Sequence, residues 1–440
     1  MVGARLTGTT VAVSERFADL TPDPQWAFAH LTQSQTSYAT HGYHRYPAKF
    51  IPQLAAKLIE EYSRPGDTVL DPFMGSGTTL VEAKRLGRPS VGVDINPVAH
   101  LIATAKVRAL EPSLLQEAVG RVHDRLMSRV QLSLFDEGWS TAHDTEWHER
   151  LRYWFRDDVL QTLSQIQRAL ECQDEAVQPF FRCALSHTLK PVSWWHDRSV
   201  KPIRKLDKSI PDPAQVFFRH VRRMAVGNRK YWEILNCAGR LETPAECFCA
   251  DARALPLADQ SVDLIVTSPP YVTSYEYADL HQLSALWFQM TTDLREFRQG
   301  FIGRSNGVHE PKEDLHSPLA EAIVSRLGEL NPRKAREVAL YFAEMYECFV
   351  EWRRVMCPNG YACIVIGNTY LNGVEVQNAQ VFAEQLDTLG FVLTRVILRE
   401  IPSKILPRTR DRQTGKFAKT LTADYLAYPT EYVLVFQRLR

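Results

Sequence analysis

Apolar and polar residues in the first part of the chain follow two different periods. Residues 51–61 (IPQLAAKLIEE) repeat apolar side chains at helical spacing, whereas residues 68–70 form a short apolar run that predicts a buried strand. Residues 78–86 predict a second helix that ends at Gly87, and residues 90–93 predict a second strand with Asp94 at its tip. The succession of strand, loop, helix and strand is the start of an α/β sheet.

The α/β pattern stops at about residue 110 and resumes at about residue 243. The stretch between is mostly helical, with helices expected over residues 114–127, 159–170 and 216–224. After it, strands are expected at 247–250, 262–267, 361–366, 391–398 and 432–436, and helices at 338–356 and 380–389. We therefore expect an arm at 1–40, an α/β domain split into 41–110 and 243–440, and a helical insertion at 111–242. The last two strands are expected to form a hairpin that closes the sheet.

The amino-acid composition excludes several classes of protein. The 440 residues are 45% hydrophobic and 23% charged, with a net charge of +1, which excludes disordered, collagen-like and coiled-coil chains. No apolar run reaches the length of a membrane span, and the first 20 residues have no apolar core like that of a signal peptide. Eight cysteines form no CxxC pair, so we expect free thiols in a reducing cytoplasm. Cys247 and Cys249 alternate in an apolar stretch, which predicts two inward positions of a buried strand.

Residues 71–79 (DPFMGSGTT) join the first strand to the second helix. Two glycines in such a turn let backbone N–H groups approach a ligand at a positive helix end. The lysine of a phosphate-binding P-loop and the third glycine of a dinucleotide loop are both missing. A tight structural turn is the alternative. Asp94, about 20 residues further on, is placed to hydrogen-bond ribose hydroxyls, which favours an adenosine ligand.

The DPFMGSGTT segment resembles the S-adenosylmethionine-binding motif of the amino-directed DNA methyltransferases. That family methylates the N4 amine of cytosine or the N6 amine of adenine, so the resemblance implies a Rossmann-like, seven-stranded, mostly parallel sheet of the class I methyltransferase type. It also implies that Asp94 holds the ribose and that Asp71 supports the loop and the cofactor's amino group. The cofactor-binding residues implied in this way are Tyr46, Lys49, Phe50, Asp71, Phe73, Gly75, Gly77, Thr78, Thr79, Asp94, Ile95, Asp251 and Ala252.

The segment before the first helix is similar to the family's cover over the methionine end of the cofactor. Residues 44–52 read HRYPAKFIP, so Tyr46 and Phe50 would pack on the cofactor and Lys49 would orient its carboxylate. A capped helix start is the alternative. Asp251 would bind the adenine amine, with a helix cap as the alternative. His41 and His44 have no further metal ligands near them in the sequence, so no metal is expected.

Residues 267–271 (TSPPY) follow the strand at 262–266. Each proline fixes φ and removes a donor, which leaves rigid carbonyl acceptors at the strand's end. By resemblance the catalytic residues are Ser268, Pro269, Pro270 and Tyr271. The Ser268 hydroxyl and a carbonyl near Pro269 would hold the amine's hydrogens, and Tyr271 would stack on a base taken out of the duplex.

Two observations bear on which base is methylated. Serine at the first motif position is typical of N4-cytosine enzymes, whereas Asp or Asn is typical of N6-adenine enzymes, and some serine-containing members act on adenine. Methylation at cytosine C5 needs a cysteine in a Pro-Cys loop. Cys357-Pro358 has the reverse order at an expected helix end, so we interpret it as structural.

Two basic blocks are candidates for DNA contact. Residues 186–230 hold eleven cations against three aspartates, a local charge of +8, and residues 395–419 hold eight against two acids, or +6. Basic residues interleaved with aromatics suit phosphate contact and base stacking, although a solvated face is the ordinary explanation of a charged run. The candidate DNA-binding residues are Trp194, Trp195, Arg198, Lys201, Arg204, Lys205, Arg408, Arg410 and Arg412.

These features predict a DNA methyltransferase that uses S-adenosylmethionine to methylate the N4 amine of cytosine in double-stranded DNA. The alternatives are an N6-adenine enzyme, an RNA base methyltransferase and a non-catalytic DNA-binding protein. A cognate restriction endonuclease is a further candidate partner. The cofactor motif precedes the catalytic motif, which is the reverse of the order in many N4-cytosine relatives and leaves the place of the recognition region open.

Overall fold

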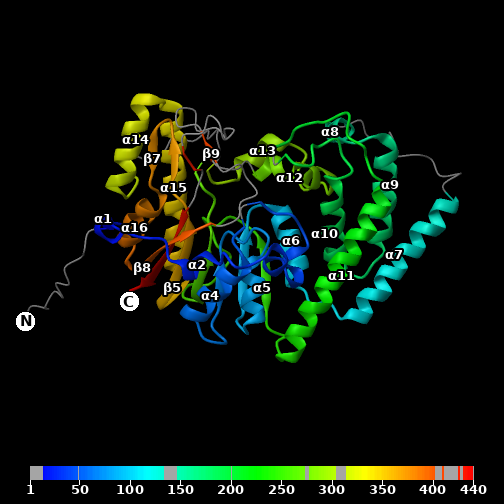
Figure 1. Ribbon diagram of the computed structural model, residues 1–440, viewed down its shortest axis with the longest axis horizontal. Helices are drawn as coiled ribbons and strands as arrows, with labels where there is room; N and C mark the ends of the chain where they lie inside the picture. Colours follow the sequence, from blue (N-terminus) through cyan, green and yellow to red (C-terminus); the bar gives the residue numbers. More distant parts are fainter. Residues whose placement is uncertain are drawn as a thin grey trace, which may run out of the picture.

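A seven-stranded sheet forms the centre of the molecule (Figure 1). The computed structural model describes residues 13–47, 49–132, 146–199, 201–272, 277–303, 314–401, 409–410, 425–426 and 430–439. The strands of the large sheet are β1 (Val69–Asp71), β2 (Ser90–Asp94), β3 (Ala245–Cys249), β4 (Val262–Thr267), β5 (Met356–Ile366), β8 (Phe391–Glu400) and β11 (Thr430–Arg438). Two short pairs lie outside it: β6 (Thr369–Leu371) with β7 (Val374–Val376), and β9 (Thr409–Arg410) with β10 (Tyr425–Leu426).

The strand order is β3-β2-β1-β4-β5-β11-β8. The neighbours from β3 to β5 are parallel, and β11 is antiparallel to both β5 and β8. The order therefore reverses between β1 and β4, and ligands of open α/β sheets bind at such a switch point, beyond the carboxyl ends of the strands. The expected closing hairpin of the last two long strands is confirmed, since β8 and β11 pair along their whole lengths.

Helices cover both faces of the sheet. α4 (Pro52–Tyr62) precedes the first strand, and the helices that connect the strands are α5 (Thr78–Arg85), α6 (Pro97–Val107), α14 (Pro318–Leu330), α15 (Pro332–Val355) and α16 (Asn378–Thr388). One core holds α4 against β1, β4 and β11, and another holds α14, α15 and α16 against the opposite face. α1 (Val13–Arg16), α2 (Pro24–Ala27), α3 (Gln33–Thr36) and η1 (Ala39–Gly42) are short turns along the N-terminal segment.

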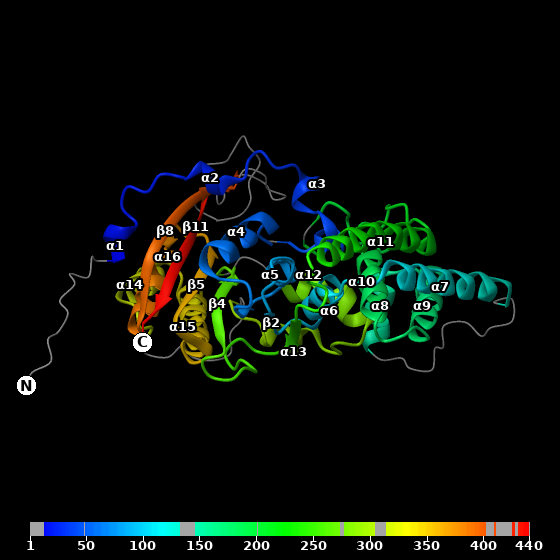
Figure 2. The ribbon, with the colours of Figure 1, turned by 90° about the horizontal axis from the view of Figure 1, so that it is seen from below.

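A helical block lies at the other end of the molecule from α14 and α16 (Figures 1 and 2). It comprises α7 (Pro112–Leu132), α8 (Glu146–Trp154), α9 (Asp157–Glu171), α10 (Gln178–Leu189) and α11 (Pro213–Cys237). α12 (Tyr277–Trp287) and α13 (Leu294–Gln299) follow the catalytic motif, and α12 shares an apolar core with α6 and the block. The block is therefore packed directly against the part of the sheet domain that carries the two motifs.

Two details differ from the expectations. Cys247 and Cys249 lie on β3, an edge strand with β2 as its only partner in the sheet, so Cys249 is exposed and Cys247 is only partly buried. Alternation of apolar residues does not distinguish an edge strand from a central one. Cys357 lies in β5 instead of at a helix end, and its thiol donates to the carbonyl of Gln260. None of the helices in the described part of the chain combines the length and apolarity that a bilayer crossing needs.

Candidate active site

A cavity of about 840 Å³, including its open mouth, lies at the switch point of the sheet. The walls come from the segment before α4, the loop after β1, the tips of β2 and β3, the loop after β4 and the segment around α12 and α13. The lining residues are Tyr46, Lys49, Phe50, Asp71, Pro72, Phe73, Met74, Gly75, Ser76, Thr78, Asp94, Ile95, Asp251, Ala252, Ser268, Pro270, Tyr277, Gly300, Phe301 and Ile302.

The glycine loop takes its shape from two left-handed residues. Gly75 has φ +47° and Gly77 has φ +72°, a region that side chains rarely adopt. Gly77 is the N-cap of α5, and a Cβ placed on it would lie 2.9 Å from the Cβ of Ala103 on α6. Gly77 therefore serves a close helix approach, and it does not itself line the cavity as the resemblance suggested.

The two neighbouring threonines have different surroundings. Thr79 is fully buried and donates to the carbonyl of Val266 on β4 at 3.1 Å, so it fixes α5 to the sheet and does not reach the cavity. Thr78 lines the cavity, and its buried Oγ1 has no hydrogen-bond partner in the described structure. Because a buried hydroxyl without a partner is costly, Thr78 provides a hydrogen-bonding group ready for a polar ligand.

Asp94 connects the glycine loop to the tip of β2. Its carboxylate accepts hydrogen bonds from the backbone N–H of Gly75 and of Asn96, both at 2.9 Å. Burial raises the pKa of Asp94 to about 6, although those two hydrogen bonds act in the opposite direction. Burial likewise raises the pKa of Asp71 to about 6. At neutral pH both carboxylates are ionised acceptors at the cavity wall.

The end of β4 is joined to the end of β1, and the loop after β4 is held by α15. The hydroxyl of Thr267 donates to Asp71 at 2.6 Å, which joins the two motifs directly. The hydroxyl of Tyr341, on α15, donates to the carbonyl of Pro270 at 2.9 Å. Of the diproline carbonyls that the sequence left as acceptors, the one of Pro270 is therefore already engaged.

Ser268 lines the cavity, whereas Pro269 and Tyr271 do not. Tyr271 lies beside Gly367 at the end of β5, where a Cβ on the glycine would be 3.2 Å from the ring. Its hydroxyl donates to Glu431 at 3.3 Å, and Glu431 is paired with Arg399. Neither Thr267, Tyr341 nor Glu431 was singled out from the sequence, because each acts through a contact between distant segments.

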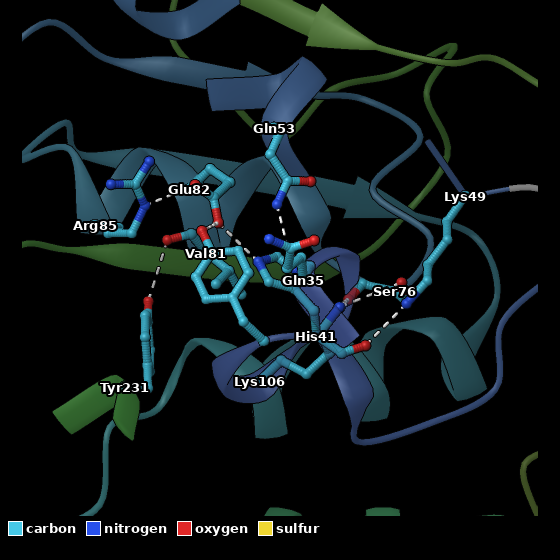
Figure 3. Close-up of polar contacts among 11 residues, drawn as sticks. Gln35, His41, Lys49, Gln53, Ser76, Val81, Glu82, Arg85, Lys106 and Tyr231 are labelled. Carbon is cyan, nitrogen blue, oxygen red and sulfur yellow. Dashed lines mark hydrogen bonds and ion pairs between the residues drawn. The ribbon is translucent and has the colours of Figure 1, made fainter. Parts of the chain in front are cut away.

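A buried polar cluster supports the segment before α4 (Figure 3). The imidazole of His41 lies 2.7 Å from Glu82 on α5, and both side chains are fully buried. Glu82 also pairs with Arg85 at 2.7 Å and accepts from Tyr38. Burial lowers the pKa of His41 to about 4, so the ring is neutral at pH 7 and donates from Nε2 to the carboxylate.

Two lysines extend this cluster to the cavity. Lys49 donates to the backbone carbonyl of His41 at 2.8 Å, and burial lowers its pKa to about 8. Lys106 donates to the carbonyl of Ser76 at 2.6 Å and so holds the glycine loop from behind. Figure 3 shows both contacts. His41 is thus held by Glu82, and the ring of His44 lies 3.0 Å from the Ser186 hydroxyl and 3.0 Å from the carbonyl of Arg45. No three His, Cys, Asp or Glu side chains in the described ranges are grouped to hold a metal ion.

Asp251 lines the cavity at the end of β3, but its carboxylate is already paired with Arg253 at 2.7 Å. Tyr46 lies over Gly75 and packs against His281. The wall formed by Tyr277 and residues 300–302 was not anticipated, because no motif marks it. Gly300 permits it, since a Cβ there would lie 3.0 Å from the side chain of Ile95.

The candidate DNA-binding residues lie in two regions, of which one is described. Trp195 is 1% exposed and stacks on Trp154 with 5.2 Å between ring centroids, so the prediction that it stacks on a base does not fit this structure. Trp194 is partly buried. Arg198, Lys201, Arg204 and Lys205 are exposed. Arg410 lies in β9, and Arg408 and Arg412 lie outside the described residues.

The strand order, the glycine loop after β1 and the acid at the end of β2 define a class I methyltransferase. The model of the amino-directed DNA methylase family matches residues 13–105 and 262–439, more than half of the chain. The protein belongs to this DNA methylase family. Its cofactor is S-adenosylmethionine and its substrate is DNA.

Similar proteins include named DNA-modification enzymes. The chain is 27% identical over 423 residues to the Type II methyltransferase M.MvaI of Kocuria varians, covering 91% of this chain and 93% of the relative. It is 26% identical over 334 residues to M.BsoBI of Geobacillus stearothermophilus, covering 68% and 63%. A solved S-adenosylmethionine-dependent methyltransferase of Methanosarcina mazei matches at 10% identity and a TM-score of 0.28, over 90% of this chain and 99% of that one. The fold assignment rests on the strand order instead.

Proposed function

We propose that the protein methylates the N4 amine of a cytosine that is turned out of duplex DNA. The observation that carries this proposal is the position of Ser268 on the same cavity as Gly75, Thr78 and Asp94. A serine at the head of the SPPY motif is typical of N4-cytosine members of the family. The adjoining cofactor wall would put a methyl donor within reach of a base held at that serine.

The polar side chains that line the cavity match the polar groups of the cofactor. Bound S-adenosylmethionine supplies a methyl group on a sulfonium centre. Asp94 would accept from the ribose hydroxyls, and Lys49 and Thr78 would hold the polar methionine end. Asp251 is a candidate for the adenine amine, shared with Arg253. The unpartnered hydroxyl of Thr78 is the sign that a polar ligand belongs there.

The protein's contribution to the transfer would be positioning. An exocyclic amine is a weak nucleophile because its lone pair is delocalised into the ring. The Ser268 hydroxyl and the Pro269 carbonyl would accept its two hydrogens and direct the lone pair toward the cofactor. Tyr341 fixes the loop through Pro270, whereas Tyr271 would have to turn away from Glu431 and Gly367 to stack on the base as the resemblance implies. The base would have to leave the helix, because Ser268 lines a cavity that a paired base cannot reach.

The helical segment at 111–242 is the region we propose for DNA recognition, since it carries exposed cations and packs against the side of the sheet that holds the cavity. A restriction endonuclease with the same specificity would be the matching partner.

The test is mass spectrometry of nucleosides from unmethylated plasmid DNA incubated with the protein and S-adenosylmethionine. N4-methylcytosine is the expected product. N6-methyladenine would overturn the base assignment and leave the family and cofactor in place. Ser268→Ala serves as the matched control, because it removes one acceptor of the amine and leaves the cofactor wall intact.

A further inference from the structure

The connection between α10 and α11 forms a short hairpin whose second arm carries an exposed apolar side chain, with another directly after it. Ile203 is 52% exposed and Leu206 is 62% exposed, and Leu206 is the most exposed large apolar side chain among the described residues. Single exposed apolar residues are common on protein surfaces and need no explanation. Here Ile203 lies in the second arm of the hairpin and Leu206 directly follows the last paired residue, Lys205, and both stand among exposed cations.

The hairpin is held firmly at its base. Its two arms pair through the N–H of His196 with the carbonyl of Ile203, at 2.8 Å, and the N–H of Lys205 with the carbonyl of Trp194, at 2.7 Å. The buried ring of Trp195 fixes one arm in the core of the helical block.

Lys208 closes the hairpin from the other arm. Its ammonium, only 6% exposed, lies 2.8 Å from Asp197 and donates to the carbonyls of Lys190 and Trp195. A firmly held arm loses little conformational entropy when it contacts a partner, so the exposed side chains at 203 and 206 are pre-organised for binding.

The cations beside these two apolar side chains suit contact with nucleic acid. Lys201, Arg204 and Lys205 are exposed, and Arg204 lies over the ring of Tyr153 at 4.4 Å, which directs it along α8. Basic side chains beside apolar ones are the combination with which proteins contact phosphates and push apolar groups between base pairs.

The hairpin also lies close to the cavity. Burial and the neighbouring Arg45 lower the pKa of Lys190, at the hairpin's base, to about 8, and Arg45 directly precedes Tyr46 of the cavity wall. α8 packs against α12, which supplies Tyr277 to the same wall. In Figure 1 the connection from α10 to α11 runs beside α8 on the side of α12 and α13.

We infer that Ile203 and Leu206 form a wedge that enters the base stack of duplex DNA next to the extruded base, while Lys201, Arg204 and Lys205 contact the flanking phosphates. The inference rests on the proposed function, since it assumes that a base leaves the stack. The wedge would fill the space left behind and lower the cost of extrusion.

The experiment compares binding to two DNA duplexes of the same sequence, one intact and one with a single abasic site. An abasic site removes the cost of unstacking a base, so the wild-type protein should prefer that duplex by about tenfold. Ile203→Ser/Leu206→Ser should lose the preference while keeping its affinity for S-adenosylmethionine. Leu330→Ser is the matched control, because Leu330 is 60% exposed on α14 at the other end of the molecule and should keep the preference.

Two further variants separate the wedge from general DNA affinity. Ile203→Met/Leu206→Met keeps apolar side chains at both positions and should restore the preference. Lys205→Ala should instead weaken binding to both duplexes and reduce its dependence on salt. Equal preference in the wild type and the serine double variant would overturn the wedge. Because the binding assay needs no methyl transfer, this result is distinguishable from a failure of the proposed function, in which no methylated base forms.

Discussion

Acid should weaken cofactor binding through one carboxylate, Asp94. Its pKa of about 6 results from burial, with opposing hydrogen bonds from Asn96 and Gly75. In the proposed site, the ionised carboxylate accepts from the ribose hydroxyls, and protonation removes an acceptor. If only the ionised form binds tightly, affinity is halved near pH 6 and falls by up to about tenfold for each pH unit below it. At pH 5 the loss is about tenfold, or about 1.4 kcal/mol.

The assay is calorimetric titration of S-adenosylmethionine between pH 5 and pH 7.5. The wild-type affinity should fall on the acid side, and Asp94→Asn should bind weakly at pH 7.5 with a much flatter profile. Asp71→Asn is the matched control, because the pKa of Asp71 is also raised to about 6 but its carboxylate is held by Thr267 and Phe73. Asp71→Asn should still lose affinity for the cofactor as the pH falls. If Asp94→Asn loses cofactor affinity at acid pH as strongly as the wild type does, the reasoning is refuted.

Three other substitutions distinguish a residue proposed to act in methyl transfer from residues that stabilise the fold around the site. Ser268→Ala should lower turnover by about 100-fold or more with unchanged calorimetric affinity for the cofactor, and unchanged turnover would remove Ser268 from the mechanism. Gly77→Ala should lower the free energy of unfolding by about 1–2 kcal/mol because of the left-handed backbone at this position, and further because the new Cβ would meet Ala103. Urea unfolding measures this loss. Gly120→Ala is the control and should show no such loss, because Gly120 has open space around it. Glu82→Ala removes the acceptor of the buried His41 Nε2–H and the ion-pair partner of Arg85, and should cost about 2 kcal/mol and raise the KM for cofactor. A loss below about 1 kcal/mol would contradict the role given to the cluster around His41.

Much of the sheet domain could be predicted because its elements are short and strongly patterned. The helix at 51–61 and the strand at 90–93 were placed to within one or two residues of α4 and β2. The helices α12, α13 and α14 were not anticipated, and α8 and α10 were covered only by the general expectation of a helical insertion. α10 and α12 are buried on several sides and so show no single apolar stripe. The exposure of Cys249 was missed for a related reason, since the sequence does not say which strand lies at the edge of the sheet.

By itself the sequence determined the local chemistry of the two loops. The glycines of residues 71–79 have the freedom that a turn into a helix demands, and the diproline stiffens the end of β4, so both properties belong to the residues themselves. The tertiary structure alone decided what joins them: Thr267 on Asp71, Tyr341 on Pro270, and the wall around Gly300 that completes the cavity. It also decided that Trp195 is buried while Leu206 is exposed. Such contacts join segments far apart in the chain, and their partners are set by packing instead of by any local pattern.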